Sequence, residues 1–507
     1  MRSNRRPIAV FLGMALASLI VALNAERAST QAPADAAVLQ YHKNPTRDGH
    51  YIEAAFTPTA AARLHLDSTF SAALNGPTFA QPLYWAATTG SDRDMIIAAT
   101  EQNEVTAFDP GTGAVIWHTT VGAPVPLSQM PCGNINPLGI TGTPIIDPVS
   151  RTLFAAAMTM TGDVKTHIVT ALSIDDGSTR PGWPIDISTV TTGASTFEPL
   201  VQGQRGALAL LGNSVYVPYG GHFGDCGDYH GWVVGIPISG PGAPTGWATR
   251  AVRGGIWGVG GIASDGVSLY VATGNTSQAK TWSDGEATIR LQPGPAFSGQ
   301  RSDFFAPLNW RSLDAGDLDL GGSGVLLVHA LGATPSSLVV ALGKDGNAYL
   351  VDRQNMGGIG RFVARQSVSS APIINGPAAY STAKGTYVAF RGTGVGCPGH
   401  NPGDLVAIKI GAAAPPTISV AWCTTANGAG SPIVTTTDDQ SNAIVWTVGA
   451  AGDNRLHGFD GDTGQVVFGG GGPGDAMTSV RKFQTPIVAK GRIFVAGDSA
   501  LFAFTTQ

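Results

Sequence analysis

The chain has 507 residues, of which 43% are hydrophobic and only 13% charged, and its net charge is −5. So apolar a sequence can bury a large core, which excludes an intrinsically disordered chain. The small net charge provides no basic surface for nucleic acid or an anionic membrane, so neither is expected as a partner.

Glycine accounts for 68 residues, roughly twice the share expected from a usual content of about 7%. No three-residue period accompanies it, so the chain is not collagen-like. No charged run or proline-rich spacer divides the chain into separate apolar regions. Many short strands joined by glycine-rich turns would give this balance, and we expect one all-β domain.

The first 32 residues predict export. Three arginines precede an apolar stretch from Ile8 to Leu23, and small and polar residues follow up to Ala32. This order is typical of a secretory signal peptide, so we interpret residues 1–32 as signal peptide and cleavage region and 33–507 as the exported domain. The alternative is an uncleaved anchor, but the apolar stretch is shorter than the roughly 20 residues of a spanning helix. We expect a periplasmic or secreted protein without stable membrane insertion after cleavage.

A hairpin motif recurs along the chain. Residues Phe108–Trp117 and Phe459–Phe468 both have the pattern F-D-x-x-T-G-x-V-x-aromatic, and Ala171–Trp183 is a looser copy with its turn at Asp175–Thr179. The aspartate is expected to cap the amides of the turn, and the glycine to adopt the positive φ that the turn needs. The strand that follows brings a large aromatic side chain between neighbouring sheets, where it fastens one blade to the next.

A second repeated element is a proline or glycine followed by aliphatic residues, which suits the first residue of a strand. It occurs at Pro82-Leu83, Pro144-Ile145-Ile146, Pro199-Leu200, Gly261-Ile262, Gly324-Val325, Pro372-Ile373-Ile374, Pro432-Ile433-Val434 and Pro486-Ile487-Val488. The β-rich runs between these starts are Met95–Ala99, Thr152–Ala157, Ser214–Pro218, Ser268–Thr273, Ser337–Leu342 and Ile493–Ala496.

These eight starts lie about 48 to 63 residues apart, which is enough for a four-stranded blade. The sequence therefore predicts a single eight-bladed β-propeller of four-stranded antiparallel blades. The last blade, from Thr485 to Phe504, has room for three strands, and an N-terminal strand around Leu64–Phe70 would supply the fourth. A seven-bladed ring with one irregular blade is the alternative.

All four cysteines lie in the exported part: Cys132, Cys226, Cys397 and Cys423. An even number in an oxidising compartment indicates two disulfides, for which three pairings exist. Pairing Cys397 with Cys423 inside one blade is favoured, which leaves Cys132 with Cys226. No C-x-x-C spacing occurs, so a thiolate zinc site is not expected.

The repeats resemble the PQQ-like repeats of quinoprotein alcohol dehydrogenases and of several non-catalytic bacterial propellers, from about Tyr41 to Gln507. The chain also resembles a family of exported bacterial propellers without an established activity. The segments that carry this second resemblance are Tyr41-His42-Lys43-Asn44, Arg47-Asp48-Gly49, Gly139–Pro144, Tyr229–Trp232, Gly343–Gly346 and Asp352-Arg353. Because the repeat motif is structural, the resemblance implies the fold and leaves the function open.

The dehydrogenase resemblance implies a cofactor site containing PQQ and calcium. Trp257 would be the tryptophan on which PQQ stacks, and Asn275 a calcium ligand, with Asp225 or Asp228 at the position of the glutamate ligand. Three aspartates after Asn275 are candidates for the catalytic base, namely Asp284, Asp303 and Asp314. The chain lacks the adjacent cysteine pair and the C-x-x-C-H haem motif of those enzymes, which argues against this activity.

Two other polar groups are candidates for metal sites. His222, Asp225, Asp228 and His230 lie within nine residues of a glycine-rich loop, where the alternative is a solvated, disulfide-tied loop. Asp314, Asp317 and Asp319 form an alternating acidic triplet that suits calcium, with a solvated turn as the alternative. No G-x-S-x-G, P-loop or H-E-x-x-H motif is present, so hydrolase or nucleotide chemistry lacks support.

We therefore predict an exported binding or scaffold protein that recognises a protein, glycan or small molecule on one face of the ring. A PQQ- and calcium-dependent dehydrogenase using Trp257 and Asn275 is the first alternative. A glycan-binding or glycan-active propeller is the second, with Trp257, Trp282 and Trp310 stacking on sugar rings.

Overall fold

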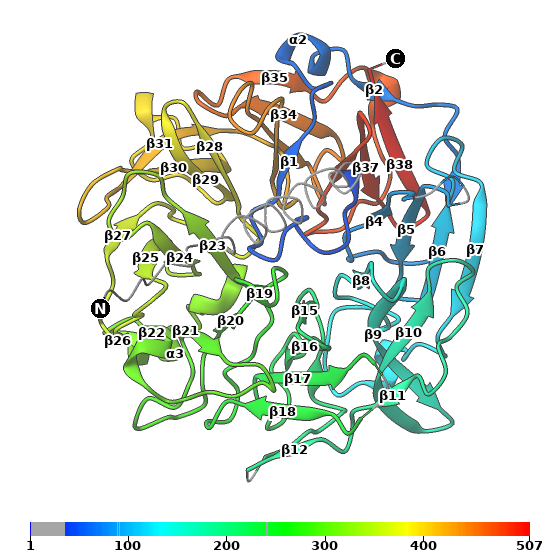
Figure 1. Cartoon of the computed structure of the whole chain (residues 1–507), viewed down its shortest axis with the longest axis vertical. Coiled ribbons are helices and arrows are strands. Elements are labelled where there is room, and N and C mark those ends of the chain that lie inside the picture. Colours follow the sequence, from blue (N-terminus) through cyan, green and yellow to red (C-terminus); the bar gives the residue numbers. More distant parts are fainter. Residues whose placement is uncertain (2–35, 89, 91, 194, 240–241, 507) are drawn as a thin grey trace.

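The chain forms a ring of eight blades, which follow one another in sequence order (Figure 1). The computed structural model describes Met1 and residues 36–506, except 89, 91, 194, 240 and 241. Apart from Met1, the predicted signal peptide and cleavage region at 1–32 lie outside these residues. The eight-bladed all-β prediction is confirmed, and the seven-bladed alternative is wrong.

The first four blades occupy residues 83–306. Blade 1 consists of β4 (Leu83–Trp85), β5 (Met95–Ala99), β6 (Glu104–Phe108) and β7 (Val115–Thr120). Blade 2 consists of β8 (Ile145–Asp147), β9 (Thr152–Thr161), β10 (Val164–Ser173) and β11 (Ile185–Asp186). Blade 3 consists of β14 (Gln202–Gly203), β15 (Ala209–Leu211), β16 (Ser214–Gly221), β17 (Trp232–Pro237) and β18 (Thr245–Ala248). Blade 4 consists of β19 (Ala263–Ser264), β20 (Leu269–Thr273), β21 (Ala287–Leu291) and β22 (Phe304–Ala306), with β26 (Gly358–Ile359) parallel at its edge.

The last four blades complete the ring. Blade 5 consists of β23 (Val325–His329), β24 (Ser337–Leu342), β25 (Asn347–Asp352) and β27 (Ala364–Ser367). Blade 6 consists of β28 (Ala378–Thr382), β29 (Gly385–Arg391), β30 (Leu405–Ile410) and β31 (Ile418–Thr424). Blade 7 consists of β32 (Ile433–Thr436), β33 (Ile444–Val448), β34 (Leu456–Asp460) and β35 (Val466–Gly469), and β1 (His50–Ile52) adds to it in parallel. Blade 8 contains β36 (Ile487–Ala489), β37 (Arg492–Ala496) and β38 (Ala500–Thr505).

The remaining elements are short. A two-stranded ribbon pairs β12 (Thr191–Thr192) with β13 (Ser195–Thr196). The helices are α2 (Pro58–Ala61) and α3 (Trp310–Gly316), with 3₁₀ turns η2 (Leu127–Gln129), η3 (Arg301–Asp303), η4 (Leu320–Ser323), η5 (Pro398–His400) and η6 (Pro473–Asp475). Among the described residues, no helix is both long and apolar enough to cross a membrane.

The N-terminal part of the chain closes blade 8, as predicted. The strands β2 (His65–Leu66) and β3 (Ala72–Ala73) both pair antiparallel with β38, the last strand of the chain. The blue β2 lies beside the red β38 in Figure 1. Because the two ends of the chain share one sheet, the ring has no open edge there.

The repeated hairpin motif has the predicted geometry. Asp109 Oδ1 accepts hydrogen bonds from the amides of Gly111 and Thr112 at 3.0 and 2.8 Å. Asp460 Oδ1 does the same at Asp462 and Thr463, at 3.1 and 2.9 Å. The motif glycines have φ of 79° at Gly113 and 71° at Gly464, in the left-handed region that glycine favours.

Tryptophans of the fourth strands fasten neighbouring blades. Trp117 of blade 1 is buried and donates from Nε1 to the carbonyl of Ile174 in blade 2, at 2.8 Å. Trp422 of blade 6 donates in the same way to Gly461 of blade 7, also at 2.8 Å. A Cβ at the motif glycine Gly464 would lie 2.8 Å from the Trp422 ring, so a side chain there would displace the indole.

One predicted strand start is misplaced. In blade 6 the innermost strand β28 begins at Ala378 and not at Ile373. The side chains before it pack elsewhere, since Ile374 joins the axial cluster of Tyr41, Ala207, Val259 and Phe483. In blade 3, Pro199-Leu200 do precede β14, but the inner position is divided between β14 and β15, which both pair with β16.

Residues 38–53 line the inside of the ring and contact its blades in turn. Their backbone exchanges hydrogen bonds with the innermost strands of blades 1, 2, 4, 5, 6 and 7. These bonds join Val38 to Tyr84, Leu39 to Ile146, Pro45 to Ser264, Thr46 to Leu327, Asp48 to Ala379 and Gly49 to Val434, at 2.7–3.0 Å. We call residues 38–53 the axial segment; Glu53 completes it by accepting from the amide of Gly491 in blade 8.

Arg47 joins the axial segment to blade 3, which those backbone bonds do not reach, and adds a second contact to blade 4. Its side chain is 2% exposed and donates to the carbonyls of Leu208 at 2.6 Å and Ile262 at 2.6 and 2.9 Å. It also donates to the carbonyl of Tyr41, at 2.9 Å. Burial lowers the pKa of Arg47 to about 10, so the guanidinium stays charged at neutral pH.

In an antiparallel blade, successive turns alternate between the two faces of the ring. The turns between second and third strands therefore share one face with the connections between blades, which we call the connection face. Both disulfides lie at this face: Cys132 pairs with Cys226, and Cys397 pairs with Cys423, which lies next to the last residue of β31. This is the pairing that the sequence favours.

Replacing Arg47 with methionine should lower the stability of the whole ring. The change leaves three buried carbonyls without their donor, at a cost on the order of 3 kcal/mol, so the melting temperature should fall by several degrees. Arg63→Met is the matched control, because Arg63 is exposed. Equal melting temperatures for the two variants in differential scanning calorimetry would show that the axial segment does not hold the ring together.

Candidate functional site

Polar side chains gather around Trp257 on the connection face, where blades 4 and 5 meet. Trp257 lies in the connection between β18 and β19, and Asn275 and Glu286 lie in the loop between β20 and β21. Asp319 directly precedes η4, and Lys344 follows β24. Loops of two neighbouring blades thus supply one site, which we call the Trp257 site.

The Trp257 indole is half-buried and lies between two glycines. A Cβ at Gly274 would lie 3.2 Å from the indole Nε1 and only 2.6 Å from Asp319 Oδ1. A Cβ at Gly322 would lie 3.4 Å from the ring. Gly274 therefore makes room for both the indole and the carboxylate, and the part of the ring that stays exposed is available for stacking.

Lys344 brings a positive charge to this ring. Its Nζ lies 5.3 Å from the centroid of the Trp257 ring, within range of a cation–π interaction. It also pairs with Asp319 at 2.6 Å and Asp317 at 2.8 Å. Burial opposes the charged ammonium, but these carboxylates outweigh burial and raise the pKa of Lys344.

Asp319 is the carboxylate that orients the site. Its side chain is 4% exposed, and its Oδ1 accepts from the amide of Asn275 at 2.7 Å. One oxygen thus fixes the loop that carries Asn275, while the other holds Lys344. Asp317, in contrast, is 67% exposed, so solvent screens its charge.

Glu286 is a buried carboxyl beneath the same site. Its Oε2 accepts from the amide of Leu320 at 2.7 Å, and Oε1 has no hydrogen-bond partner among the described residues. Burial, followed by the neighbouring charge of Asp319, raises the pKa of Glu286 to about 9. The group is therefore protonated at neutral pH, and the buried part of the site carries one charge of each sign.

The acidic triplet is divided between two partners. Asp314, on α3, accepts from the amide and hydroxyl of Thr276 at 2.8 and 2.6 Å, whereas Asp317 and Asp319 hold Lys344. Within the described part of the chain, no group of three or more His, Cys, Asp or Glu side chains is arranged to hold a metal ion. The three carboxylates are thus not gathered at one point, and a calcium site at the triplet stays a prediction.

The loop that contains Asp225 and Asp228 is tied down by other contacts. Asp225 accepts from the Tyr229 hydroxyl at 2.8 Å and pairs with Arg253 at 3.4 Å, while Asp228 is exposed. Arg253 already neutralises Asp225, which opposes a role in binding calcium; the assignment of Asp225, Asp228 and Asn275 as metal ligands stays a prediction.

The two histidines of this loop point to different partners. His230 Nδ1 lies 2.7 Å from the carbonyl of Thr249. His222 is 7% exposed and lines a separate cavity beneath the Cys132–Cys226 disulfide. The Cys132–Cys226 disulfide thus ties this loop down, and a metal site in it stays a prediction.

Two of the three candidate bases form their ion pairs with arginines and not with groups around Trp257. Asp284 is buried and receives two hydrogen bonds from the Arg250 guanidinium, at 2.7 and 2.8 Å. Asp303 pairs with Arg290 and lies before β22, in the turn that faces away from the connection face. The carboxylate that the structure places by Trp257 is Asp319, which the sequence singled out only as part of the acidic triplet.

The aromatic side chains proposed for sugar stacking do not form one surface. Trp282 stacks on Phe304 with ring centroids 4.0 Å apart and also faces Arg250. Trp310 is 5% exposed. Trp282 and Trp310 therefore offer little open ring surface beside Trp257, and the glycan-binding alternative stays a prediction.

Lys344 and Glu286 are the site residues that sequence reasoning missed. Lys344 belongs to the Gly343–Gly346 turn, which was noted only for its resemblance. A lysine in the turn between a second and third strand points to the connection face, and this position was the available signal. Glu286 gave no such signal, because its burial depends on the loop that folds back over it.

Comparison with known proteins agrees with this architecture. Neither a protein-family model nor a curated protein sequence matches the chain. Among solved structures, the quinohemoprotein alcohol dehydrogenase of Comamonas testosteroni is similar over 95% of this chain and 82% of its own, with a TM-score of 0.61 and 13% identity. The quinohemoprotein alcohol dehydrogenase ADHIIG of Pseudomonas putida HK5 is similar over 93% of this chain and 81% of its own, with a TM-score of 0.61 and 12% identity. A europium-containing methanol dehydrogenase is similar over 94% of this chain and 92% of its own, with a TM-score of 0.59 and 15% identity.

The chain has the fold of the quinoprotein alcohol dehydrogenases. At these identities the likeness concerns the fold and leaves the chemistry to the residues of the site. In this propeller, the residues around Trp257 supply one aromatic ring and one cation, Lys344. A calcium ion would not find three gathered carboxylates, and both disulfides join distant cysteines.

Glu286 makes the stability of this propeller depend on pH. The unfolded chain ionises this carboxyl above its ordinary pKa of 4.5, while the folded chain keeps the proton up to about 9. The unfolded state therefore binds fewer protons in this window, and stability falls as pH rises through it. The Glu286→Gln variant should lose this part of the fall in stability with pH. Its melting temperature should exceed that of the wild type by a few degrees at pH 8 and equal it at pH 4.

Melting curves between pH 4 and 9 test this, with Glu198→Gln as the control because Glu198 is exposed. Parallel curves for the wild type and Glu286→Gln would contradict a protonated Glu286 in the folded protein.

Proposed function

We propose that this chain is an exported binding protein that holds a planar, acceptor-rich ligand on Trp257, with Lys344 as the group that recognises its oxygens. The observation that supports this is the position of the Lys344 ammonium, 5.3 Å from the centroid of a half-exposed indole and held there by Asp319. A planar ligand can stack on the Trp257 ring. Its carbonyl or carboxylate oxygens can accept hydrogen bonds from the Lys344 ammonium.

The charges around the ring favour such a ligand. The buried Asp319 and Lys344 neutralise each other, and Glu286 is uncharged at neutral pH. An ammonium has three N–H donors, and Asp319 and the exposed Asp317 account for two. A ligand oxygen can therefore take the third donor, or replace Asp317, without leaving the buried carboxylate unpaired.

Export is part of the proposal. The two disulfides support it, because disulfides persist in oxidising compartments and are rare in the cytosol. The signal sequence predicted at 1–32 would direct the chain there. The ring itself offers a rigid scaffold whose connection face presents the site to the periplasm or the medium.

Pyrroloquinoline quinone is the probe that tests the proposal, since it is planar and carries carboxylates and a quinone. We expect it to quench the fluorescence of the mature protein and to raise its melting temperature at tens of micromolar. Trp257→Leu and Lys344→Met should each weaken binding of the quinone at least tenfold. Circular dichroism verifies that Lys344→Met still folds. Trp183→Leu and Lys384→Met are matched controls, because Trp183 and Lys384 lie on the opposite face.

Equal affinity in Trp257→Leu and wild type, or no binding at several hundred micromolar, would overturn the proposal. Titrations with Ca²⁺ and with a chelator show whether the ligand enters with a metal. Reduction of an electron-accepting dye by the loaded protein and an alcohol would establish the dehydrogenase alternative.

A further inference from the structure

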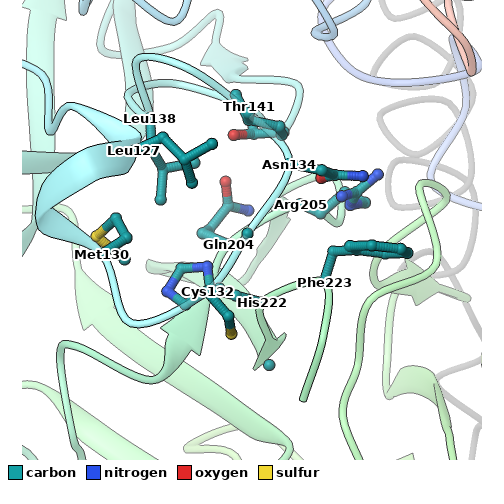
Figure 2. Close-up of a pocket in the computed structure, with 14 residues that line it drawn as sticks. Leu127, Met130, Cys132, Asn134, Leu138, Thr141, Gln204, Arg205, His222 and Phe223 are labelled. Carbon is teal, nitrogen blue, oxygen red and sulfur yellow. The ribbon is translucent and has the colours of Figure 1, made fainter. Parts of the chain in front are cut away.

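A second polar site lies on the connection face, beneath the Cys132–Cys226 disulfide. Figure 2 shows its cavity, with Leu127, Met130 and Leu138 opposite Gln204 and His222. Its volume is about 30 Å³, which is room for one or two water molecules or one small polar group. We call it the disulfide pocket.

Two buried polar atoms of the disulfide pocket have no partner. His222 is 7% exposed and Thr141 is 3% exposed, and both line the cavity. Neither His222 Nε2 nor Thr141 Oγ1 has a hydrogen-bond partner among the described residues. Leaving such atoms unpaired costs about 1–3 kcal/mol each, so their position in a cavity points to a ligand that pairs with them.

Gln204, in contrast, is already satisfied. Its Oε1 accepts from the amide of Gly142 at 3.0 Å, and its Nε2 donates to the carbonyl of Gly206 at 2.6 Å. Gln204 therefore shapes the cavity floor. Thr141 also lies within reach of the Glu101 carboxyl, so a bound head group would share its hydroxyl with Glu101.

Arg205 gives the pocket its charge. Its guanidinium lies 5.5 Å from the centroid of the Phe483 ring, and Lys482 lies 5.1 Å from the same ring. Among the described residues neither cation forms a salt bridge, and the carboxyl that acts on Arg205 is the buried Glu101. Burial raises the pKa of Glu101 to about 7, so Glu101 offsets only part of this positive charge at neutral pH.

The opposite wall is apolar. Leu127, Met130, Ile135 and Leu138 line it. At the rim, Phe223 is 67% exposed, and Figure 2 shows its ring near Arg205 and Asn134. A ligand that fits therefore has an anionic head of a few atoms and an apolar part that lies against this wall and Phe223.

We propose that the disulfide pocket binds the carboxylate of a ligand with an apolar side chain or tail, through Arg205 and Thr141. His222 stays neutral because burial lowers its pKa to about 4, and it adds a hydrogen bond to the carboxylate when its proton lies on Nε2. A carboxylate suits a single guanidinium, which it can pair with in a bidentate manner. The small volume admits only the head group, so the apolar part stays at the rim. The carboxylate can belong to a free organic acid or to the C-terminus of a peptide, because both present the same head group.

The disulfide holds the two walls of this pocket together. Cys132 belongs to the loop that carries the apolar wall, and Cys226 follows His222 by four residues. The loop between β7 and β8 is thus fixed over the loop between β16 and β17. We expect carboxylate binding to weaken when the disulfide is replaced by a pair of serines.

Isothermal titration of the mature protein with hexanoate and with a tripeptide ending in leucine tests the site. Each acid is compared with its amide, which has the same shape without the charge. Binding of either acid at least tenfold tighter than its amide supports the proposal, and the stronger of the two acids identifies the source of the carboxylate. Arg205→Met should remove this preference for the acid, and Thr141→Val, which keeps shape and burial, should weaken acid binding several-fold.

Arg63→Met serves as the control for the lost charge, and circular dichroism verifies that each variant folds. Trp257→Leu should bind the acids like the wild type, so the disulfide pocket and the Trp257 site fail or succeed independently. Equal binding of acid and amide, unchanged affinity in Arg205→Met, or no binding of either acid at 10 mM would overturn the proposal.

Discussion

The hydrogen bonds of the buried Arg47 are the interaction on which the rest of the structure depends. A propeller must close its ring and fill its axis, and here one N-terminal stretch does both. Residues 38–53 contact the innermost strands one after another, and Arg47 reaches the carbonyls of Leu208 in blade 3 and Ile262 in blade 4. The chain then continues into β2 and β3, which pair with β38. The same stretch of chain therefore fills the axis and leads into the strands that close the ring.

Because the ring is closed, its connection face is free to carry polar groups that would destabilise a smaller core. Neighbouring blades hold the backbone of this face in place, so it tolerates buried polar groups. These are the carboxyls of Glu286 and Glu101 and the side chains of His222 and Thr141. The Trp257 site joins loops of two blades. The disulfide pocket joins a loop between blades 1 and 2 to a loop within blade 3. In both, ligand-facing groups depend on rigid sheets for their positions.

Much of the fold was predictable because it is encoded locally. The hairpin motif carries its own aspartate cap and glycine, and the runs Met95–Ala99 and Ser337–Leu342 coincide with β5 and β24. The sites were predictable only in part, because they depend on contacts across the ring. The sequence identified Trp257 and Asn275, but it did not show that Lys344, about 90 residues later, lies over the Trp257 ring. It also did not show that Arg253 forms an ion pair with Asp225. The start of blade 6 was misplaced for the same reason: Ile374 packs on the axis with Tyr41, more than 300 residues away.

A crystal structure of the mature protein with pyrroloquinoline quinone tests the central claim most directly. We expect a planar ring stacked on the exposed part of Trp257, with one of its oxygens within hydrogen-bond distance of Lys344 Nζ and the axial segment unmoved. A quinone ordered elsewhere on the ring, or a bare Trp257 in crystals soaked at millimolar concentration, would contradict it.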